Sequence, residues 1–375
     1  MVKSLPLVSL LAFPLLGAGC MGDPDAPAGP KQGPSASEQA PSPLVTAHQG
    51  PVTRLAFGAD GQTLASSGRD GLIRLWEVAT GAERRHILAH PRGVNALAFA
   101  LDGYTLASAG ESDPAIALWE AATGRKVGEI RDGRAAQALA FSPDGQLLAS
   151  AGFDPKVHLW EVATRKRLHD WGPRGRLVGR PVFTSVAFSP DGQALAAGNA
   201  NGTVSVWDVA SGSRRMLLEG HRDMVLSVAF SPDGQVLASG AVDHIVRLWE
   251  AGTGKILREL TSPDESLWAV AFAPEGKLLA ALGESSVQLW DPATGSLVRP
   301  LAGGQGQLTA LAFAPDGRTL ATGSTEGVLT LWETTTGQER RPLRGLPHPE
   351  VEAWKTRWEA DHQAGPRGRP RGPRA

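Results

Sequence analysis

The amino-acid sequence predicts an all-β fold made of seven copies of one four-stranded antiparallel unit. Glycine (45 residues) and proline (28 residues) are abundant among the 375 residues, which favours turns and short strands over long helices. One tryptophan also recurs about every 42 residues, and such a period indicates a repeat architecture. The recurring residues are Trp76, Trp119, Trp160, Trp207, Trp249, Trp290 and Trp332.

The fifth unit contains every part of the repeat. Apolar runs at 225–230, 236–240, 245–249 and 256–260 are of strand length, and Ser231-Pro232-Asp233-Gly234 separates the first two. Proline presets φ at the first turn position, and glycine accepts the positive φ that a bulged hairpin needs. Glycine occupies this turn in all seven units, at positions 61, 103, 145, 192, 234, 276 and 317.

These units resemble the WD40 repeat in Leu248-Trp249-Glu250, Val206-Trp207-Asp208 and Gly220-His221, over about residues 44–345. The resemblance implies a single seven-bladed β-propeller of four-stranded antiparallel blades. The related TolB-type propellers share the Ser-Pro-Asp-Gly turn, but they do not account for the Leu-Trp-Glu and Thr-Gly motifs.

The resemblance also implies a structural tetrad of His, Ser or Thr, Asp and Trp in each blade. It is complete in units one and five and nearly so in unit two, through His48, Ser66, Asp70, Trp76, His90, Ser108, Asp113, Trp119, His221, Ser239, Asp243 and Trp249. The third unit keeps Ser150, Asp154 and Trp160 without a histidine, and the fourth has Asn201 in place of aspartate. The seventh has Thr322, Glu326 and Trp332, and the sixth keeps only Trp290. We expect tryptophan packing to hold the blades and the polar groups to refine them.

Two segments compete for the outermost strand of the seventh blade. Residues 44–47 align with the outer strand of a blade, and 338–343 follow the third strand directly but carry Pro342. Proline is acceptable there only because an outer strand is an edge strand. By analogy with the family, we favour 44–47.

Residues 1–19 have the layout of a secretory signal peptide, with Lys3, an apolar stretch at 5–16 and the small residues 17–19. Gly17-Ala18-Gly19-Cys20 resembles the bacterial lipobox, although Gly17 stands where leucine is usual. The resemblance implies a lipidated Cys20, followed through residue 43 by a disordered tether rich in Gly, Pro, Ala and Ser. We therefore expect an exported lipoprotein anchored to the cell envelope. An ordinary signal peptide, or a cytoplasmic chain without processing, remains the alternative.

Nothing in the sequence predicts catalysis or a cofactor. Cys20 is the single cysteine, so intramolecular disulfides and cysteine-type zinc sites are excluded. No phosphate loop, GxSxG elbow or HExxH helix is present. The His–Asp pairs belong to the tetrads, and His86, His158 and His169 are interpreted as isolated strand histidines. No metal site is expected. A propeller enzyme would need acids or histidines around the channel mouth.

We predict a partner-binding face at the narrow end of the central channel. Seven first-strand positions should surround its mouth: Thr53, Asn95, Gln137, Thr184, Leu226, Trp268 and Thr309. Exposed tryptophan is enriched at binding hot spots, although Trp268 could instead cover blade six. An insertion at 171–180 adds Arg174, Arg176 and Arg180, as either a recognition loop or a solvated one. Loop tips contribute Arg69, Phe153 and Val242.

Residues 346–375 follow the ring. Trp354 and Trp358 stand four residues apart in 351–362, which predicts a short helix packed on the propeller or on a partner. The tail with Arg367, Arg369, Arg371 and Arg374 is expected to be disordered. With a net charge of −1, the chain has no general affinity for nucleic acid. We expect a monomeric, non-enzymatic scaffold for a protein or peptide, with an intracellular regulatory scaffold as the alternative.

Overall fold

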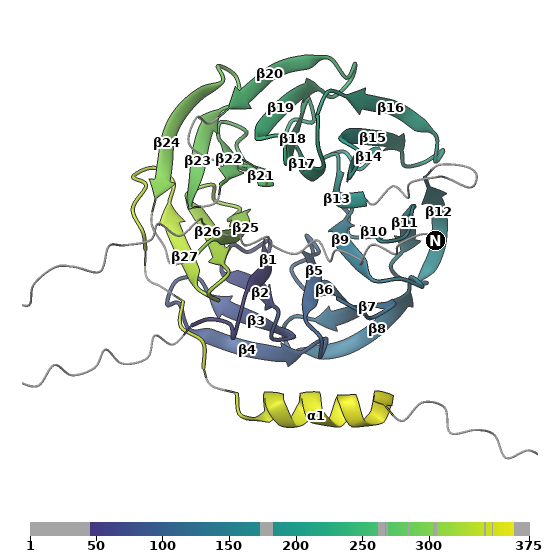
Figure 1. The fold of residues 1–375 in the computed structure, drawn as a ribbon, viewed down its shortest axis with the longest axis vertical. Helices are drawn as coiled ribbons and strands as arrows, with labels where there is room; N and C mark the ends of the chain where they lie inside the picture. Colours follow the sequence, from purple (N-terminus) through teal and green to yellow (C-terminus); the bar gives the residue numbers. More distant parts are fainter. Residues whose placement is uncertain are drawn as a thin grey trace, which may run out of the picture. The chain divides into compact units, whose positions relative to one another are not determined.

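Each repeat folds into an antiparallel sheet whose strands follow one another in chain order, and the sheets stand around a central channel (Figure 1). The computed structural model describes residues 46–172, 183–261, 267, 269–283, 285–302, 306–340, 343–346 and 348–363. Six sheets have four strands and the last has three named strands, so the predicted seven-bladed propeller is confirmed.

The first strand of every blade lines the channel and the fourth lies at the rim (Figure 1). Blades one to three consist of β1 (Val52–Phe57), β2 (Thr63–Gly68), β3 (Leu72–Glu77), β4 (Glu83–Leu88), β5 (Val94–Phe99), β6 (Thr105–Gly110), β7 (Ala115–Glu120), β8 (Arg125–Arg131), β9 (Ala136–Phe141), β10 (Leu147–Gly152), β11 (Val157–Glu161) and β12 (Lys166–Trp171).

Blades four to seven repeat this order. Their strands are β13 (Phe183–Phe188), β14 (Ala194–Asn199), β15 (Thr203–Asp208), β16 (Arg214–Glu219), β17 (Val225–Phe230), β18 (Val236–Ala241), β19 (Ile245–Glu250), β20 (Ile256–Thr261), β21 (Ala269–Phe272), β22 (Leu279–Leu282), β23 (Ser286–Asp291), β24 (Ser296–Ala302), β25 (Leu308–Phe313), β26 (Thr319–Ser324) and β27 (Leu329–Glu333).

The hydrophobic core lies between blades. Each tryptophan packs against the blade before its own, as Trp119 of β7 does against Ile73 and Ile87 of blade one. The same arrangement recurs at the other interfaces between neighbouring blades. A large buried aromatic removes on the order of 150–250 Å² from water, so the tryptophans hold neighbouring blades together.

The turn between the first two strands has the predicted geometry. In blade five the Ser231 hydroxyl donates to the Asp233 carboxylate at 2.5 Å and accepts from the Val236 amide at 2.9 Å. Gly234 has a φ of 71°, a left-handed conformation that glycine adopts at no steric cost.

Ring closure differs from the prediction. The segment after β27 bridges back to it through Trp332–Glu339 and Leu329–Leu343, and thereby takes the outer place in blade seven. Ala47 is buried in the interface between blades seven and one and forms no such bridge, so the preference for 44–47 was wrong. A short local turn costs less loop-closure entropy than a connection across the whole chain. Residues 44–45 lie outside the described residues.

Noncovalent contacts close the ring. The Thr309 hydroxyl of blade seven donates to the Val52 carbonyl of β1 at 2.6 Å. The His48 amide donates to the Gly327 carbonyl at 3.0 Å. Around these bonds, Val52 and other apolar residues of blades seven and one form one buried cluster.

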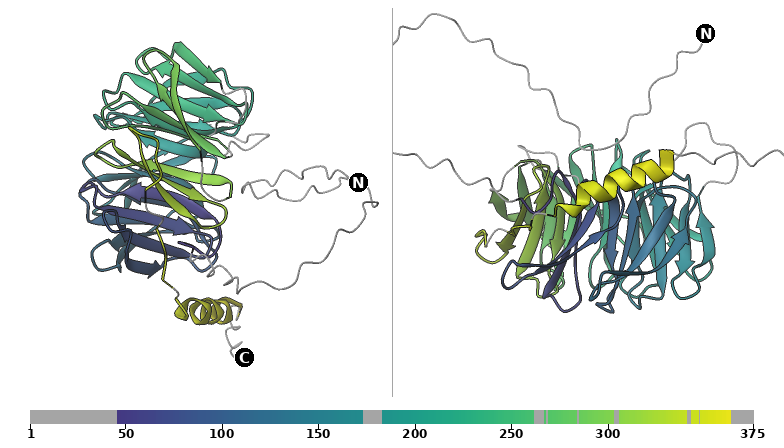
Figure 2. Two further views of the ribbon diagram at one scale, coloured as in Figure 1. Left: turned by 90° about the vertical axis from the view of Figure 1, so that its left-hand side faces the viewer. Right: turned by 90° about the horizontal axis from the view of Figure 1, so that it is seen from below.

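After the ring comes α1 (Glu350–Gln363), outside the ring beside blade one (Figures 1 and 2). Val351 is buried, and Arg92 stands over the Trp358 ring at 5.2 Å. A Cβ added to Gly71 of the β2–β3 turn would lie 3.4 Å from Trp354, so this indole lies against the turn. The helix was predicted to pack on the propeller or on a partner, and in the structure it packs on the propeller. No helix within the described segments has the length and apolar character needed to cross a membrane.

Candidate protein-binding face

The candidate face is the end of the channel where each chain segment enters a first strand and where second strands turn into third strands. Several of the residues predicted for this face lie outside the described residues. They are Trp268, Arg174, Arg176 and Arg180. The predicted lipidation site, Cys20, is outside them as well.

Of the predicted residues that are described, Phe153 fits an open binding surface best. It follows β10 and leaves 40% of its surface exposed. Leu226 and Gln137 are half-buried in their first strands. Asn95 is only 6% exposed, so it does not present an accessible polar group as expected. Arg69 is held by Glu111 of blade two, with 2.8 Å between guanidinium and carboxylate.

Two of the three threonines at the predicted ring positions, Thr184 and Thr309, join neighbouring blades. Thr184 donates to the carbonyl of Val225 in the next blade, as Thr309 does to Val52. Both threonines also contact a carbonyl of their own second strand, at Gly198 and Gly323. These hydroxyls are therefore parts of the scaffold.

Sequence reasoning missed Arg54, whose half-buried side chain reaches from blade one to blade three. It donates to the Thr53 carbonyl at 2.8 Å and, past blade two, to the Gln137 carbonyl of blade three at 3.1 Å. Burial lowers the pKa of Arg54 below its ordinary value. Among the ion pairs of the described residues, none neutralises this guanidinium. The equivalent positions of the other six repeats hold only alanine or serine, which is the signal that would have revealed it.

The structure brings the predicted tetrad residues of blades one, two and five together. In blade one, Trp76 Nε1 donates to Ser66 Oγ at 2.8 Å, and Ser66 lies 2.7 Å from His48 Nε2. His48 Nδ1 is 3.0 Å from Asp70, so Ser66 donates to Nε2 and Nδ1–H donates to the carboxylate. A Cβ on Gly68 would come within 2.5 Å of His48 Nδ1, so the histidine needs glycine there. Blades two and five repeat these contacts.

The pKa of each aspartate in these tetrads is lowered from its ordinary value. Burial acts to raise the pKa of Asp70, but His48 and the amides of Leu72 and Gln49 outweigh it, so the pKa is lowered. Asp113 and Asp243 are lowered in the same way by their hydrogen bonds. Each stable carboxylate therefore fixes its histidine in one orientation.

Blade three contains a rebuilt tetrad that the sequence analysis missed. Asp132 replaces the histidine: it accepts from Ser150 Oγ at 2.9 Å, and Ser150 accepts from Trp160 Nε1 at 3.0 Å. His158 is buried, 2.6 Å from Asp170 and 3.6 Å from Asp132. The interpretation of His158 as an isolated strand histidine was therefore wrong. The 42-residue spacing of His48, His90 and Asp132 was the available signal.

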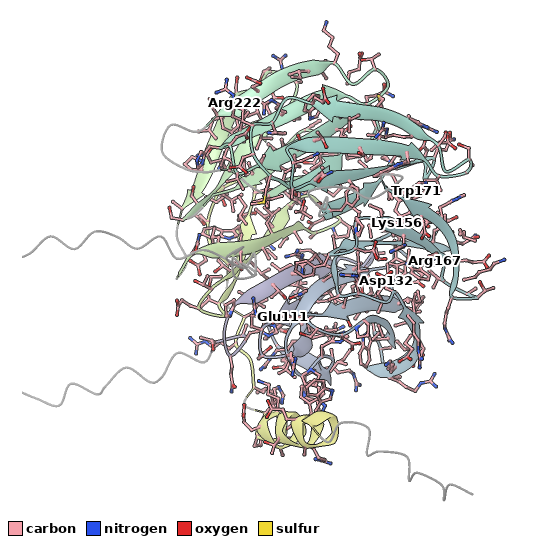
Figure 3. All side chains as sticks on the ribbon, turned by 45° about the vertical axis from the view of Figure 1, so that its right-hand side comes forward. Glu111, Asp132, Lys156, Arg167, Trp171 and Arg222 are labelled. Carbon is pink, nitrogen blue, oxygen red and sulfur yellow. The ribbon has the colours of Figure 1, made fainter. Side chains whose placement is uncertain are left out.

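Two of the three acids near His158, Asp132 and Asp170, have opposite pKa shifts. Burial raises the pKa of Asp132, helped by Asp154 and opposed by His158, Ser150 and Arg167. For Asp170 the effect of burial is outweighed by His158, Arg167 and Lys156, so its pKa is lowered. Asp132, Lys156 and Arg167 lie together on blade three (Figure 3).

Trp171 belongs to β12 and not to the insertion in which it was predicted. It is buried, stacks on Trp207 of blade four with ring centroids 5.7 Å apart, and donates to the Gly212 carbonyl at 2.9 Å. His169 stacks on Trp171 in turn, so it is not isolated either.

The tetrad is reduced in blades six and seven. Trp332 Nε1 donates to Thr322 Oγ1 at 2.8 Å. Trp290 Nε1 is buried and finds no hydrogen-bond partner among the described residues. Blade six therefore depends on packing, as expected.

A cavity of about 520 Å³ lies at the other end of the blades, between blades seven and one. The turn residues Gly61 and Gly81 line it together with Asp316 and Arg340. It is separate from the candidate face, where the available chemistry is an apolar tip at Phe153, a channel cation at Arg54 and the paired charges of blade three.

Two family models match the chain. The one described as "WD domain, G-beta repeat" matches residues 41–77, 82–120 and 132–161, and the one described as "IFT122 first beta-propeller" matches residues 182–365. The first set covers blades one to three, and the second covers blades four to seven together with α1. No curated protein matches the sequence.

Proposed function

Because the chain is a WD40-repeat β-propeller, we propose that it is a non-enzymatic scaffold that binds a protein or peptide on the candidate face. The observation that carries this proposal is the use of the tetrads. Both ring nitrogens make hydrogen bonds within the same blade in His48, His90 and His221, so these histidines have a structural role. A rigid ring that presents loops at one end suits recognition.

The face favours a peptide segment with an apolar side chain and a carboxylate. Phe153 offers exposed aromatic surface, and aromatic residues are enriched at binding hot spots. Arg54 uses two of its five N–H groups in the scaffold and can present others to a carboxylate at the channel mouth.

A matched pair of substitutions tests this face. Phe153→Asp should abolish capture of partners from a lysate of the source cells by the full-length chain, and Arg54→Gln should weaken it. Leu168→Asp is the control, because Leu168 is 42% exposed on the outer strand β12 and so matches Phe153 in exposure. Equal capture by Phe153→Asp and wild type would place the partner elsewhere, as would loss of capture in Leu168→Asp alone.

We also propose that the chain is exported and anchored to the cell envelope by a lipid on Cys20. Support comes from the lipobox-like residues 17–20 and the Gly/Pro/Ser/Ala-rich segment that follows. Cys20→Ser should move the mature protein from the detergent phase to the aqueous phase in a phase-separation assay. An unprocessed N-terminus in a mass spectrum of the native protein would instead support an intracellular scaffold.

A further inference from the structure

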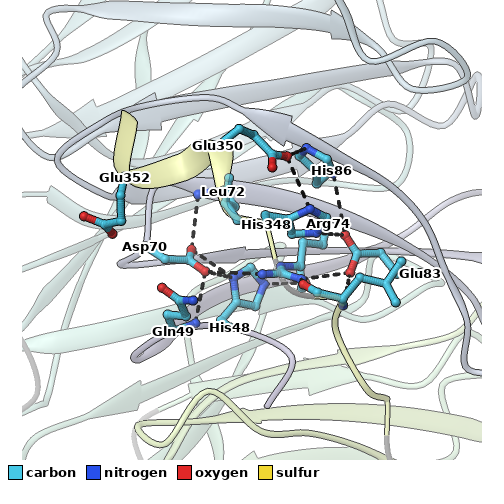
Figure 4. Close-up of polar contacts among 12 residues, drawn as sticks. His48, Gln49, Asp70, Leu72, Arg74, Glu83, His86, His348, Glu350 and Glu352 are labelled. Atoms are coloured by element: carbon cyan, nitrogen blue, oxygen red, sulfur yellow. Dashed lines mark hydrogen bonds and ion pairs between the residues drawn. The ribbon is translucent and has the colours of Figure 1, made fainter. Parts of the chain in front are cut away.

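Two histidines and two glutamates converge where the segment leading into α1 crosses β4 (Figure 4). Glu83 and His86 belong to β4, whereas His348 and Glu350 lie before and at the start of α1. Glu83, His86 and His348 each offer one potential ligand atom, and these three atoms lie within 4.8 Å of one another. The tetrads and the candidate face leave this cluster without a role.

Hydrogen bonds alone do not satisfy the two carboxylates and the two histidines when the imidazoles are neutral. His348 Nε2 is 2.8 Å from Glu83 Oε1, while His348 Nδ1 is 3.4 Å from Glu350 Oε1. A neutral imidazole has only one N–H, so one of its nitrogens then turns a lone pair toward a carboxylate oxygen. His86 lies against the same oxygen of Glu350 at 2.9 Å, with the two imidazole centroids 3.7 Å apart. A divalent cation beside Glu83 Oε1 would accept one lone pair from each ring and leave the other nitrogen of each ring facing Glu350.

Glu83 is held with one oxygen facing the histidines. Its side chain is fully buried, and Oε2 accepts from Arg74 at 2.8 Å and from the Leu346 amide at 2.8 Å. Oε1 is thereby directed at His348. Such supporting hydrogen bonds orient the ligands of metal sites before the metal binds.

We propose that Glu83, His86 and His348 form a zinc site that fastens α1 to blade one, with a water as fourth ligand. Zinc accepts imidazole and carboxylate ligands at about 2.0–2.2 Å in tetrahedral geometry, which puts neighbouring donor atoms about 3.3 Å apart. Glu83 Oε1 lies 2.8 Å from His348 Nε2 and 3.9 Å from His86 Nδ1, on either side of that value. Calcium and magnesium prefer all-oxygen ligand sets, so the two imidazoles favour zinc.

The test is a calorimetric titration of the tag-free full-length chain with Zn²⁺, combined with hydrogen exchange over 348–363. The wild type should bind one equivalent, and exchange in α1 should slow when zinc is added. His86→Gln and His348→Gln should each weaken binding by more than about 100-fold, because removing an outer-shell partner already costs about 10–100-fold. Tetrahedral visible absorption from bound Co²⁺ provides a readout of the geometry.

His244→Asn is the matched control. His244 is exposed on the β18–β19 turn with a φ of 66°, which asparagine tolerates, and it is remote in sequence from the cluster. This variant should bind zinc as the wild type does. Circular dichroism should show the ring intact in both glutamine variants, because the cluster lies outside the blade interfaces.

Two results would overturn the proposal. One is the absence of a stoichiometric Zn²⁺ equivalent in the wild type, or its persistence in both glutamine variants. The other is helix protection that follows pH and ignores zinc, which would assign the cluster to a protonated His348 paired with its two acids. Neither result bears on partner capture at the candidate face.

Discussion

Blades five and three use the same serine–tryptophan pair but opposite charges around it. In blade five, Ser239 contacts His221, whose other nitrogen faces Asp243, with 2.7 and 3.0 Å between the atoms. In blade three, Ser150 contacts Asp132, and the histidine has moved to position 158 on the third strand. Arg247 occupies that third-strand position in blade five, 2.7 Å from His221.

The comparison separates what a blade requires from what it tolerates. Both blades need a hydroxyl that accepts from the tryptophan and finds an acceptor of its own. Either an imidazole or a carboxylate can be that acceptor, provided that an opposite charge stands nearby. An uncompensated buried charge lowers stability. When the acceptor changes from an imidazole to a carboxylate, the charge of the residue beside it must therefore change as well.

The largest expected effect is equal in the two blades. Trp249→Ala and Trp160→Ala should each lower the free energy of unfolding by about 3–5 kcal/mol, because both indoles fill an interface with the preceding blade. Chemical denaturation followed by fluorescence measures both. A loss confined to one blade would contradict equal packing.

Removing the acceptor alone should cost less. His221→Ala and Asp132→Ala each leave a buried serine hydroxyl without its acceptor, for an expected loss of about 1–3 kcal/mol. Asp132→Asn is the control: it keeps an oxygen for Ser150 and should lose less than Asp132→Ala. Equal losses in the two Asp132 variants would show that charge, and not the hydrogen bond, dominates in blade three.

Rebuilding the arrangement of blade five in blade three should lower the free energy of unfolding by less than removing the acceptor does. Asp132→His combined with His158→Arg recreates the groups at positions 221 and 247. The pair should be more stable than the sum of the single changes by about 1 kcal/mol, since the residues share one network. A double-mutant cycle of unfolding free energies measures this coupling, and strict additivity would refute the proposed exchange.

The smallest effect is a pH dependence of opposite sign. The pKa of Asp243 is lowered, so its stabilisation is complete above 3.8 and is lost as pH falls through the folded-state pKa. The pKa of Asp132 is raised by burial and by Asp154, against the opposing effects of His158, Ser150 and Arg167, so its contribution declines as pH rises above 3.8. The wild type should therefore exceed Asp243→Asn in free energy of unfolding by an amount that grows as pH rises from acid toward 3.8. The amount by which the wild type exceeds Asp132→Asn should shrink as pH rises above 3.8. Denaturation midpoints across pH 2–7 test both signs.

Much of the fold was predictable because its signals are local. The apolar runs, the Ser-Pro-Asp-Gly turns and the recurring tryptophans each act within one repeat. The complete tetrads were found for the same reason, since His221, Ser239 and Trp249 lie in one unit. The tetrad of blade three escaped because motif matching looked for a histidine at the position that holds Asp132.

The candidate site was less predictable, because exposure depends on neighbouring blades. Asn95 and Thr184 occupy equivalent positions to Leu226, yet Asn95 is buried and Thr184 is bound to the next blade. The sequence places Trp171 in a loop, whereas in the structure it stacks on Trp207 of blade four. The sequence of one strand does not show which surface of the neighbouring blade will pack against it.

The sequence by itself determined the number of blades, the order of their strands and the tryptophan that anchors each one, because short-range periodicity and turn chemistry control these features. Tertiary structure alone decided that the segment after β27 completes blade seven and that Arg54 of blade one reaches Gln137 of blade three. It also brought His348 to Glu83, 265 positions away. These outcomes depend on through-space packing and charge pairing between residues that only the closed ring brings together.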